Sequence, residues 1–142
     1  MEIMRTAMMS SILLYLLLLP VGAVGEDKWD FAAPHKQRCS VGSMLDMNEC
    51  METEYTKVDA KLNRLYKQLL SSLVDPESLR KSQAAWIKFR DLDCVYSGSG
   101  ISTGGSLVSF NDNACRIDKM EKRIRDLERY LGWTCNGCPP KK

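Results

Sequence analysis

Cysteines are the residues of this chain that could most readily do chemistry. Six occur in 142 residues, and two of them, Cys135 and Cys138, form a CxxC pair. Such a pair can exchange thiols and disulfides when a helix N-terminus or a basic neighbour stabilises one thiolate. Here the pair follows the last helical pattern, precedes Pro139 and has no βαβ pattern around it. We therefore expect a structural or merely oxidised pair, with thiol–disulfide exchange as the alternative.

The remaining inventory predicts no active site. The sole histidine, His35, stands in a segment expected to be flexible, and one CxxC is only half of a zinc ribbon, so we expect no metal site. One such histidine supports no catalytic triad or Cys/His pair. Carboxylates two residues apart, such as Asp91 and Asp93, point to different helix faces. No glycine-rich phosphate-binding motif is present. We predict a protein that is not an enzyme and has no cofactor.

The beginning of the sequence has the outline of an export signal. Arg5 precedes a short apolar run over residues 12–19, and small residues follow it. The run is much shorter than the ~20 apolar residues that span a membrane. We expect residues 1–23 to be a signal peptide, cleaved after Ala23 or Gly25, and the mature protein to be periplasmic or secreted without a membrane anchor. An oxidising compartment also favours disulfides.

The mature chain has the size of one domain. We expect a flexible segment over residues 24–38, a helical domain over 39–134 and a Cys/Pro tail over 135–142. The formal net charge is +2, from 20 basic and 18 acidic residues. A charge this close to zero does not indicate nucleic acid as a partner.

Apolar periodicity predicts three helices. A stripe with alternating steps of four and three residues runs from Met51 to Leu73, and Asp75-Pro76-Glu77 is typical of a new helix start. The apolar positions of this second helix, Leu79, Ala85, Trp86, Phe89 and Leu92, are expected to face the core.

The second pattern fades after Cys94 into a Gly/Ser stretch over residues 97–106, which predicts a long loop. A third helix is expected to begin near Asn111 or Asp112 and to end at Gly132. The predicted fold is all-α: a small disulfide-stapled antiparallel three-helix bundle with a long Gly/Ser loop between helices two and three.

This topology constrains the cysteines. The start of the first helix, the end of the second and the start of the third meet at one end of the bundle, where Cys50, Cys94 and Cys115 would lie. The sequence leaves the connectivity open. We favour Cys94–Cys115, which brackets the Gly/Ser loop, and Cys39–Cys50, which would fasten the N-terminal segment. The remaining pair is then Cys135 and Cys138.

One further constellation lies on the second helix. Gln83, Trp86 and Arg90 fall at i, i+3 and i+7 and therefore share a face. We interpret Trp86 as a core anchor with hydrogen-bonding neighbours, and we expect Arg90 to pair with a carboxylate, Asp59 being the candidate. Direct partner recognition is the alternative, because Trp and Arg are favoured at interfaces.

These residues resemble the LprI-type secreted domain, a family named for an inhibitor of lysozyme. The resemblance covers most of the mature chain and implies a compact helical bundle with disulfides. It rests on Cys39, Met47-Asn48-Glu49-Cys50, Asp59, Leu62-Asn63, Tyr66, Gln83, Trp86, Arg90-Asp91, Cys94, Cys115, Arg123 and Leu127. Seven of these positions are assigned a structural or partner-binding role: Asp59, Asn63, Tyr66, Gln83, Trp86, Arg90 and Asp91. The chain departs from the family in lacking a lipoprotein cysteine and in carrying the extra Cys135/Cys138 tail.

The resemblance implies a binding protein that occludes a lysozyme or another peptidoglycan hydrolase. A lysozyme cleft holds two carboxylates in a groove shaped for a glycan, so an inhibitor needs a projecting segment. The Gly/Ser loop is our candidate, with hydroxyls to meet carboxylates and apolar residues to fill subsites. Its proposed contact residues are Ser97, Ser99, Ile101, Ser102, Thr103, Ser106 and Leu107. The alternatives are a plain flexible connector, and a periplasmic immunity or adaptor protein with another protein partner.

Overall fold

The computed structural model describes residues 34–101 and 105–142. The chain divides into two compact units, Met1–Asp30 and Phe31–Lys142, and every described residue belongs to the second. The expected signal peptide, residues 24–33 of the expected flexible segment, and Ser102 and Thr103 lie outside the described residues.

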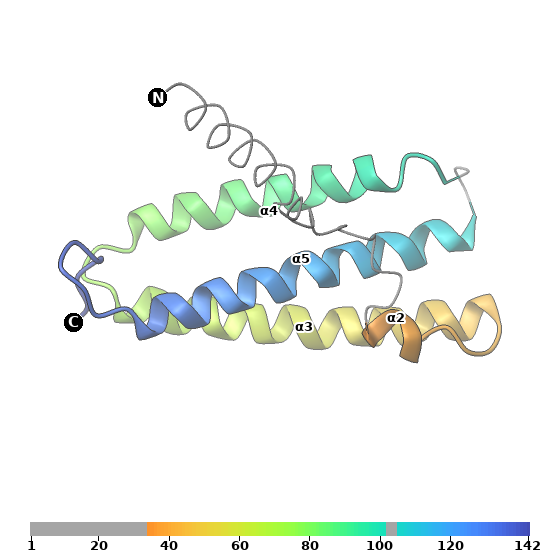
Figure 1. Cartoon of the computed structure of the whole chain (residues 1–142), viewed down its shortest axis with the longest axis horizontal. Helices are drawn as coiled ribbons and strands as arrows, with labels where there is room; N and C mark the ends of the chain where they lie inside the picture. Colours follow the sequence, from red (N-terminus) through yellow and green to blue (C-terminus); the bar gives the residue numbers. More distant parts are fainter. Residues whose placement is uncertain (1–33, 102–104) are drawn as a thin grey trace, which may run out of the picture. The chain divides into compact units, whose positions relative to one another are not determined.

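The described residues form four helices and no named strand: α2 (Pro34–Arg38), α3 (Met44–Ser72), α4 (Glu77–Ser97) and α5 (Ser106–Gly132). The expected all-α class is confirmed. In Figure 1, α4 runs opposite to α3 and α5, and α5 lies between the other two long helices. The main contacts agree, because α5 packs along α3 and also against α4, while α2 packs on α3. A full three-helix bundle, in which α4 would also pack on α3, stays a prediction.

A capping box starts α3 seven residues before Met51, the first residue of the predicted stripe. The Ser43 hydroxyl accepts a hydrogen bond from the Asp46 backbone N–H at 3.3 Å, and the Asp46 carboxylate accepts one from the Ser43 N–H at 2.8 Å. Gly42 precedes the box with φ +92°, and a Cβ there would lie 2.8 Å from Asp46 Oδ2. Glycine is therefore required at the entry to the helix.

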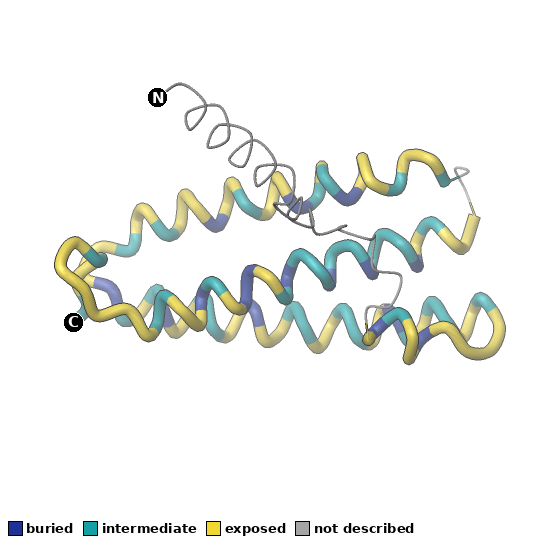
Figure 2. The backbone as a smooth tube through the Cα atoms, viewed as in Figure 1, coloured by how far each residue is buried: buried dark blue, intermediate teal, exposed yellow. Residues whose placement is uncertain are grey.

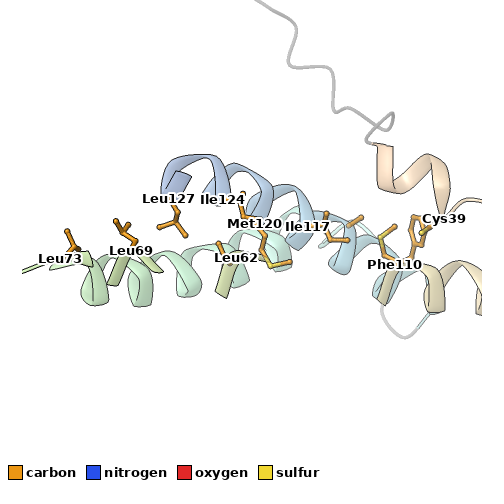
Figure 3. Close-up of a cluster of buried hydrophobic side chains, with 11 residues drawn as sticks. Cys39, Leu62, Leu69, Leu73, Phe110, Ile117, Met120, Ile124 and Leu127 are labelled. Carbon is orange, nitrogen blue, oxygen red and sulfur yellow. The ribbon is translucent and has the colours of Figure 1, made fainter. Parts of the chain in front are cut away.

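The core is mainly the seam between α3 and α5, and Figure 3 shows its side chains facing one another. Its spacing of three and four residues on each helix is the one that the sequence pattern indicates. The cluster consists of Cys39, Met51, Leu62, Leu69, Leu73, Phe110, Ala114, Ile117, Met120, Ile124 and Leu127. Among the described residues of α4, only Cys94 is a buried hydrophobic residue.

The face that α4 turns toward α5 is more polar than expected. Leu79 and Trp86 are partly buried against the core, but Phe89 and Leu92 are 56% and 61% exposed, so the prediction that they face the core is wrong. The buried residues of α4 are Gln83, Arg90 and Cys94. Because these recur at steps of seven and four, they define the inner face and turn the apolar positions outward. Figure 2 shows the resulting exposed surface along α4.

The loop between α4 and α5 is shorter than the sequence indicated. It spans residues 98–105, because α4 continues to Ser97 and α5 begins at Ser106 with Gly105 as N-cap. The prediction that this helix begins near Asn111 or Asp112 is wrong, so Ser106 and Leu107 belong to its first turn. Phe110 and Ala114 extend the helix, because both are buried in the seam with α3.

Disulfides join Cys39 to Cys50, Cys94 to Cys115 and Cys135 to Cys138, which are the pairs favoured from the sequence. The first pair helps to order α2. Residues 34–38 belong to the segment expected to be flexible, yet they form a helix that the adjoining disulfide ties to α3. A salt bridge from Arg38 to Glu54 adds a second link.

The C-terminal tail folds back onto the turn between α3 and α4. The Val74 N–H donates to the Pro140 carbonyl at 3.0 Å, and the Lys142 N–H donates to the Ser72 carbonyl at 2.9 Å. Gly137 has φ +88° in the turn closed by the Cys135–Cys138 disulfide. None of the described helices is long and apolar enough to cross a membrane.

Candidate functional site

The motif residues of α4 meet α5 through a buried hydrogen bond. Gln83 Oε1 accepts from Arg123 Nε at 3.0 Å, and the two side chains belong to residues that are 5% and 6% exposed. Arg123 Nη2 also donates to the Ser82 hydroxyl at 3.3 Å. A hydrogen bond from a guanidinium is stronger than a neutral one, and this one ties the centres of the two helices together.

Trp86 lies next to two guanidinium groups. The Cζ atoms of Arg90 and Arg123 are 5.4 and 5.7 Å from the centre of its ring, distances at which cation–π attraction operates. Trp86 also packs against the core, so it joins the polar contact between α4 and α5 to the apolar seam. This agrees with the anchoring role expected for it, although the ring is only partly buried.

The expected pairing of Arg90 with Asp59 is wrong. Arg90 Nε and Nη2 each lie 2.8 Å from Asp91 Oδ1, whereas Asp59 accepts a hydrogen bond from Asn63 at 2.7 Å within α3. The reason is the position of α4, which presents Arg90 to α5 rather than to α3. Asp59 and Asn63 thus remain on α3, where Tyr66 packs partly buried against the core.

Asp91 extends the contact between α4 and α5. It accepts a hydrogen bond from Arg116 Nη1 at 2.5 Å, and Arg116 Nε also donates to Asp112 at 2.7 Å. One turn further along, Lys119 forms a salt bridge with Asp93. Four of the seven motif residues, Gln83, Trp86, Arg90 and Asp91, therefore act together in holding α4 against α5.

A continuous row of exposed apolar residues occupies the opposite side of α4. We call it the α4 outer face and define it as Phe89, Leu92, Val95 and Tyr96, which are 56%, 61%, 64% and 80% exposed. Positions 89, 92 and 96 follow one another at steps of three and four, so they share one helix face. The α4 outer face ends where the 98–105 loop begins, and Leu107, at the other stem of the loop, is 47% exposed. Apolar surfaces of this kind typically mark interaction sites.

Sequence reasoning missed the α4 outer face because it assigned Phe89 and Leu92 to the core. The signal that could have revealed it is the spacing of Gln83, Arg90 and Cys94, which share a helix face that excludes Phe89 and Leu92. A disulfide cysteine is strongly buried as a rule, so Cys94 fixes the inner face of the helix.

The loop next to this surface is held at its stems. The Cys94–Cys115 disulfide joins the last turn of α4 to α5, with Cα atoms 5.7 Å apart. At the α4 stem, Ser97 Oγ donates to the Cys94 carbonyl at 3.1 Å, and the Ile101 N–H donates to the Gly98 carbonyl at 3.0 Å. Of the predicted loop contacts, Ser97 therefore lies on α4, Ser106 and Leu107 lie on α5, and Ser99 and Ile101 are loop residues.

The CxxC pair has the surroundings of a structural disulfide. Cys135 and Cys138 are bonded to each other in a tail that follows α5, so the N-terminal end of that helix is far along the chain from both. Lys141, three residues beyond, donates from Nζ to the Leu131 and Trp133 carbonyls at the end of α5. The disulfide thus shapes a tail that covers the C-terminus of α5.

Comparison with known proteins agrees with this architecture. The chain is 28% identical over 104 residues to the uncharacterized protein R02472 of Rhizobium meliloti (strain 1021), covering 63% of this chain and 74% of the relative. It is 28% identical over 100 residues to the uncharacterized protein YecT of Escherichia coli (strain K12), covering 59% of this chain and 62% of the relative. No solved structure matches the chain. The family described as lysozyme inhibitor LprI matches residues 36–127, which include α3, α4 and most of α5. The chain therefore belongs to the LprI lysozyme inhibitor family.

Proposed function

We propose that this chain is an exported, non-enzymatic protein that binds a lysozyme or another peptidoglycan hydrolase and blocks its cleft. The observation that carries the proposal is the α4 outer face, an exposed apolar surface that leads directly into a loop clamped at both stems by a disulfide. Membership of a family of lysozyme inhibitors supports the class of partner. The even set of cysteines and the signal-like N-terminal sequence support export to the periplasm or beyond.

In the proposed complex, the loop enters the glycan groove while the α4 outer face packs against its rim. Ser99, Ser102 and Thr103 offer hydroxyl groups to the carboxylates of the groove, and Ile101 and Leu107 fill apolar subsites. Ser97 contributes less, because its hydroxyl proton already bonds the Cys94 carbonyl. Binding then costs little ordering entropy at the stems, which the Cys94–Cys115 disulfide fixes in advance.

The motif residues on the inner side of α4 support the site without touching the hydrolase. The Gln83–Arg123 hydrogen bond and the two guanidinium groups beside Trp86 keep α4 in one orientation on α5. That orientation is what turns Phe89 and Leu92 outward. Substitutions on the inner face should therefore reduce inhibition in proportion to the loss of folding stability, and no further.

The test is inhibition of cell-wall lysis by the oxidised mature chain, titrated against hen-type, goose-type and invertebrate-type lysozymes. Two variants address the surface: replacement of residues 99–104 by a Gly/Ser linker of equal length, and Leu92→Glu on the α4 outer face. Val74→Glu is the matched control, because Val74 is also exposed, at 58%, but lies in the turn between α3 and α4.

Stoichiometric inhibition that Leu92→Glu and the linker weaken, and that Val74→Glu preserves, is the expected result. Absence of inhibition against every lysozyme class would refute the proposed partner. Full inhibition by both surface variants would refute the proposed binding surface.

A further inference from the structure

His35, the sole histidine of the chain, is buried beside two carboxylates of α5. It lies in α2 and is 2% exposed. Asp118 and Glu121 stand three residues apart on α5, so both face the same side of that helix. The three side chains offer ligand atoms that all lie within 4.8 Å of one another. The sequence had predicted no metal site because it placed His35 in a flexible segment.

The imidazole nitrogen that faces these carboxylates has no hydrogen-bond partner among the described residues. His35 Nε2 is fully buried and lies 3.5 Å from Asp118 Oδ1, beyond the ~3.2 Å upper limit of ordinary N–H···O bonds. Buried side-chain nitrogens without a partner are uncommon in folded proteins. An ion between the two groups would satisfy the nitrogen.

The separation of these two atoms suits a tetrahedral metal ion. Two ligands that are each about 2.1 Å from Zn²⁺ are about 3.4 Å apart, close to the 3.5 Å between His35 Nε2 and Asp118 Oδ1. Glu121 borders a hollow of about 330 Å³ between α3 and α5, which leaves its carboxylate room to complete the set. The Asp118 side chain is 38% exposed, so a fourth position would open to water.

The chemistry of the donor set selects the class of ion. Imidazole favours Zn²⁺ and neighbouring transition metals, whereas Mg²⁺ and Ca²⁺ prefer oxygen ligands alone. Two carboxylates also balance the double positive charge of the ion. His35 is held in place before any ion binds, because the Cys39 N–H donates to the His35 carbonyl at 3.0 Å and Cys39 is bonded to Cys50 on α3.

We propose that His35, Asp118 and Glu121 bind one divalent transition-metal ion of the Zn²⁺ class and thereby fasten α2 to α5. The disulfide and the Arg38–Glu54 salt bridge attach α2 to α3 alone. The ion adds a direct link across the core seam. Its role is structural, and it does not depend on the inhibitor function proposed above.

The experiment is a calorimetric titration of ZnCl₂ into the tag-free, oxidised mature chain after removal of metals with EDTA, repeated with MgCl₂. Thermal unfolding with and without ZnCl₂ provides the second measurement. One Zn²⁺ should bind per chain and raise the melting temperature, while MgCl₂ at the same concentration should do neither. The NMR signals of the single imidazole should shift on binding.

Variants of the partly exposed carboxylates locate the site without disturbing the buried histidine. Asp118→Asn and Glu121→Gln should each weaken Zn²⁺ binding by at least about tenfold, the lower end of the loss seen when even an outer partner of a metal site is removed. Asp126→Asn is the control, because Asp126 is on the same helix and pairs only with Arg129 among the described residues. Failure of Zn²⁺ to bind, or equal binding by all three variants, would overturn the proposal.

Discussion

Removing the Cys94–Cys115 disulfide should destabilise the domain more than removing either of the other two. The bond closes a loop with a sequence separation of 21 residues, which corresponds to about 3.3 kcal/mol of unfolded-chain entropy at 25 °C. The same relation gives about 2.8 kcal/mol for the separation of 11 in Cys39–Cys50, and about 1.6 kcal/mol for the separation of 3 in Cys135–Cys138. A domain of this size has a total stability of roughly 5–15 kcal/mol, so the first loss would be a large part of it.

The assay is urea unfolding of three double Cys→Ala variants, followed by circular dichroism. The free energies of unfolding should fall in the order of the three loop lengths. Because each lost cross-link also expands the unfolded chain, the m value should rise most for the Cys94/Cys115 variant. A loss for the Cys135/Cys138 variant that equals or exceeds the loss for Cys94/Cys115 would refute the reasoning from loop length. It would show that native contacts of the tail outweigh chain entropy.

Three further predictions follow from the contacts. Gln83→Leu leaves Arg123 without its buried amide acceptor and should cost about 1–3 kcal/mol in urea unfolding, whereas Gln68→Leu on the exposed side of α3 should change stability by less than about 0.5 kcal/mol. Hydrogen bonds from Lys57 and then Arg38 lower the pKa of Glu54 from its ordinary 4.5, so its stabilising contribution is present above that value and lost as pH falls through the lower folded pKa; Glu54→Gln should flatten this acid-side slope in unfolding measured from pH 6 to pH 2. With a formal net charge of +2, the chain gains no long-range steering toward a basic hydrolase, so its association rate should change less than about threefold between low and high salt, and a steep fall with salt would contradict an apolar interface.

The sequence allowed the α3–α5 seam to be predicted because both helices carry uninterrupted apolar residues at three- and four-residue spacing. Leu62, Leu69, Ile117 and Leu127 are buried as that pattern indicates. The disulfide pairs could also be favoured in advance, because Cys94 and Cys115 bracket a glycine-rich loop. These features depend on local spacing and chain topology, which a sequence displays directly.

The orientation of α4 could not be predicted in the same way. Its inner face contains Gln83 and Arg90, and its outer face contains Phe89 and Leu92, so hydrophobicity alone assigns the wrong face to the core. The deciding contact is Gln83 with Arg123, two residues separated by 40 positions, and nothing in local composition reveals it.

The surroundings of His35 were hidden for a related reason. A five-residue helix has too little periodicity to be recognised, and its order depends on a disulfide and on side chains of α3 and α5. Similarly, the beginning of α5 at Ser106 depends on the burial of Phe110 and Ala114 against α3 rather than on a capping residue. Tertiary contacts overrode local signals at both places.

The central claim is that the loop and the α4 outer face occupy the glycan cleft of a peptidoglycan hydrolase. It is tested most directly by measuring the affinity of the oxidised mature chain for an inhibited lysozyme with and without a saturating oligosaccharide that fills the cleft. The account predicts that the oligosaccharide weakens binding competitively. Unchanged affinity with the cleft filled would show that the protein binds elsewhere, and would contradict the account.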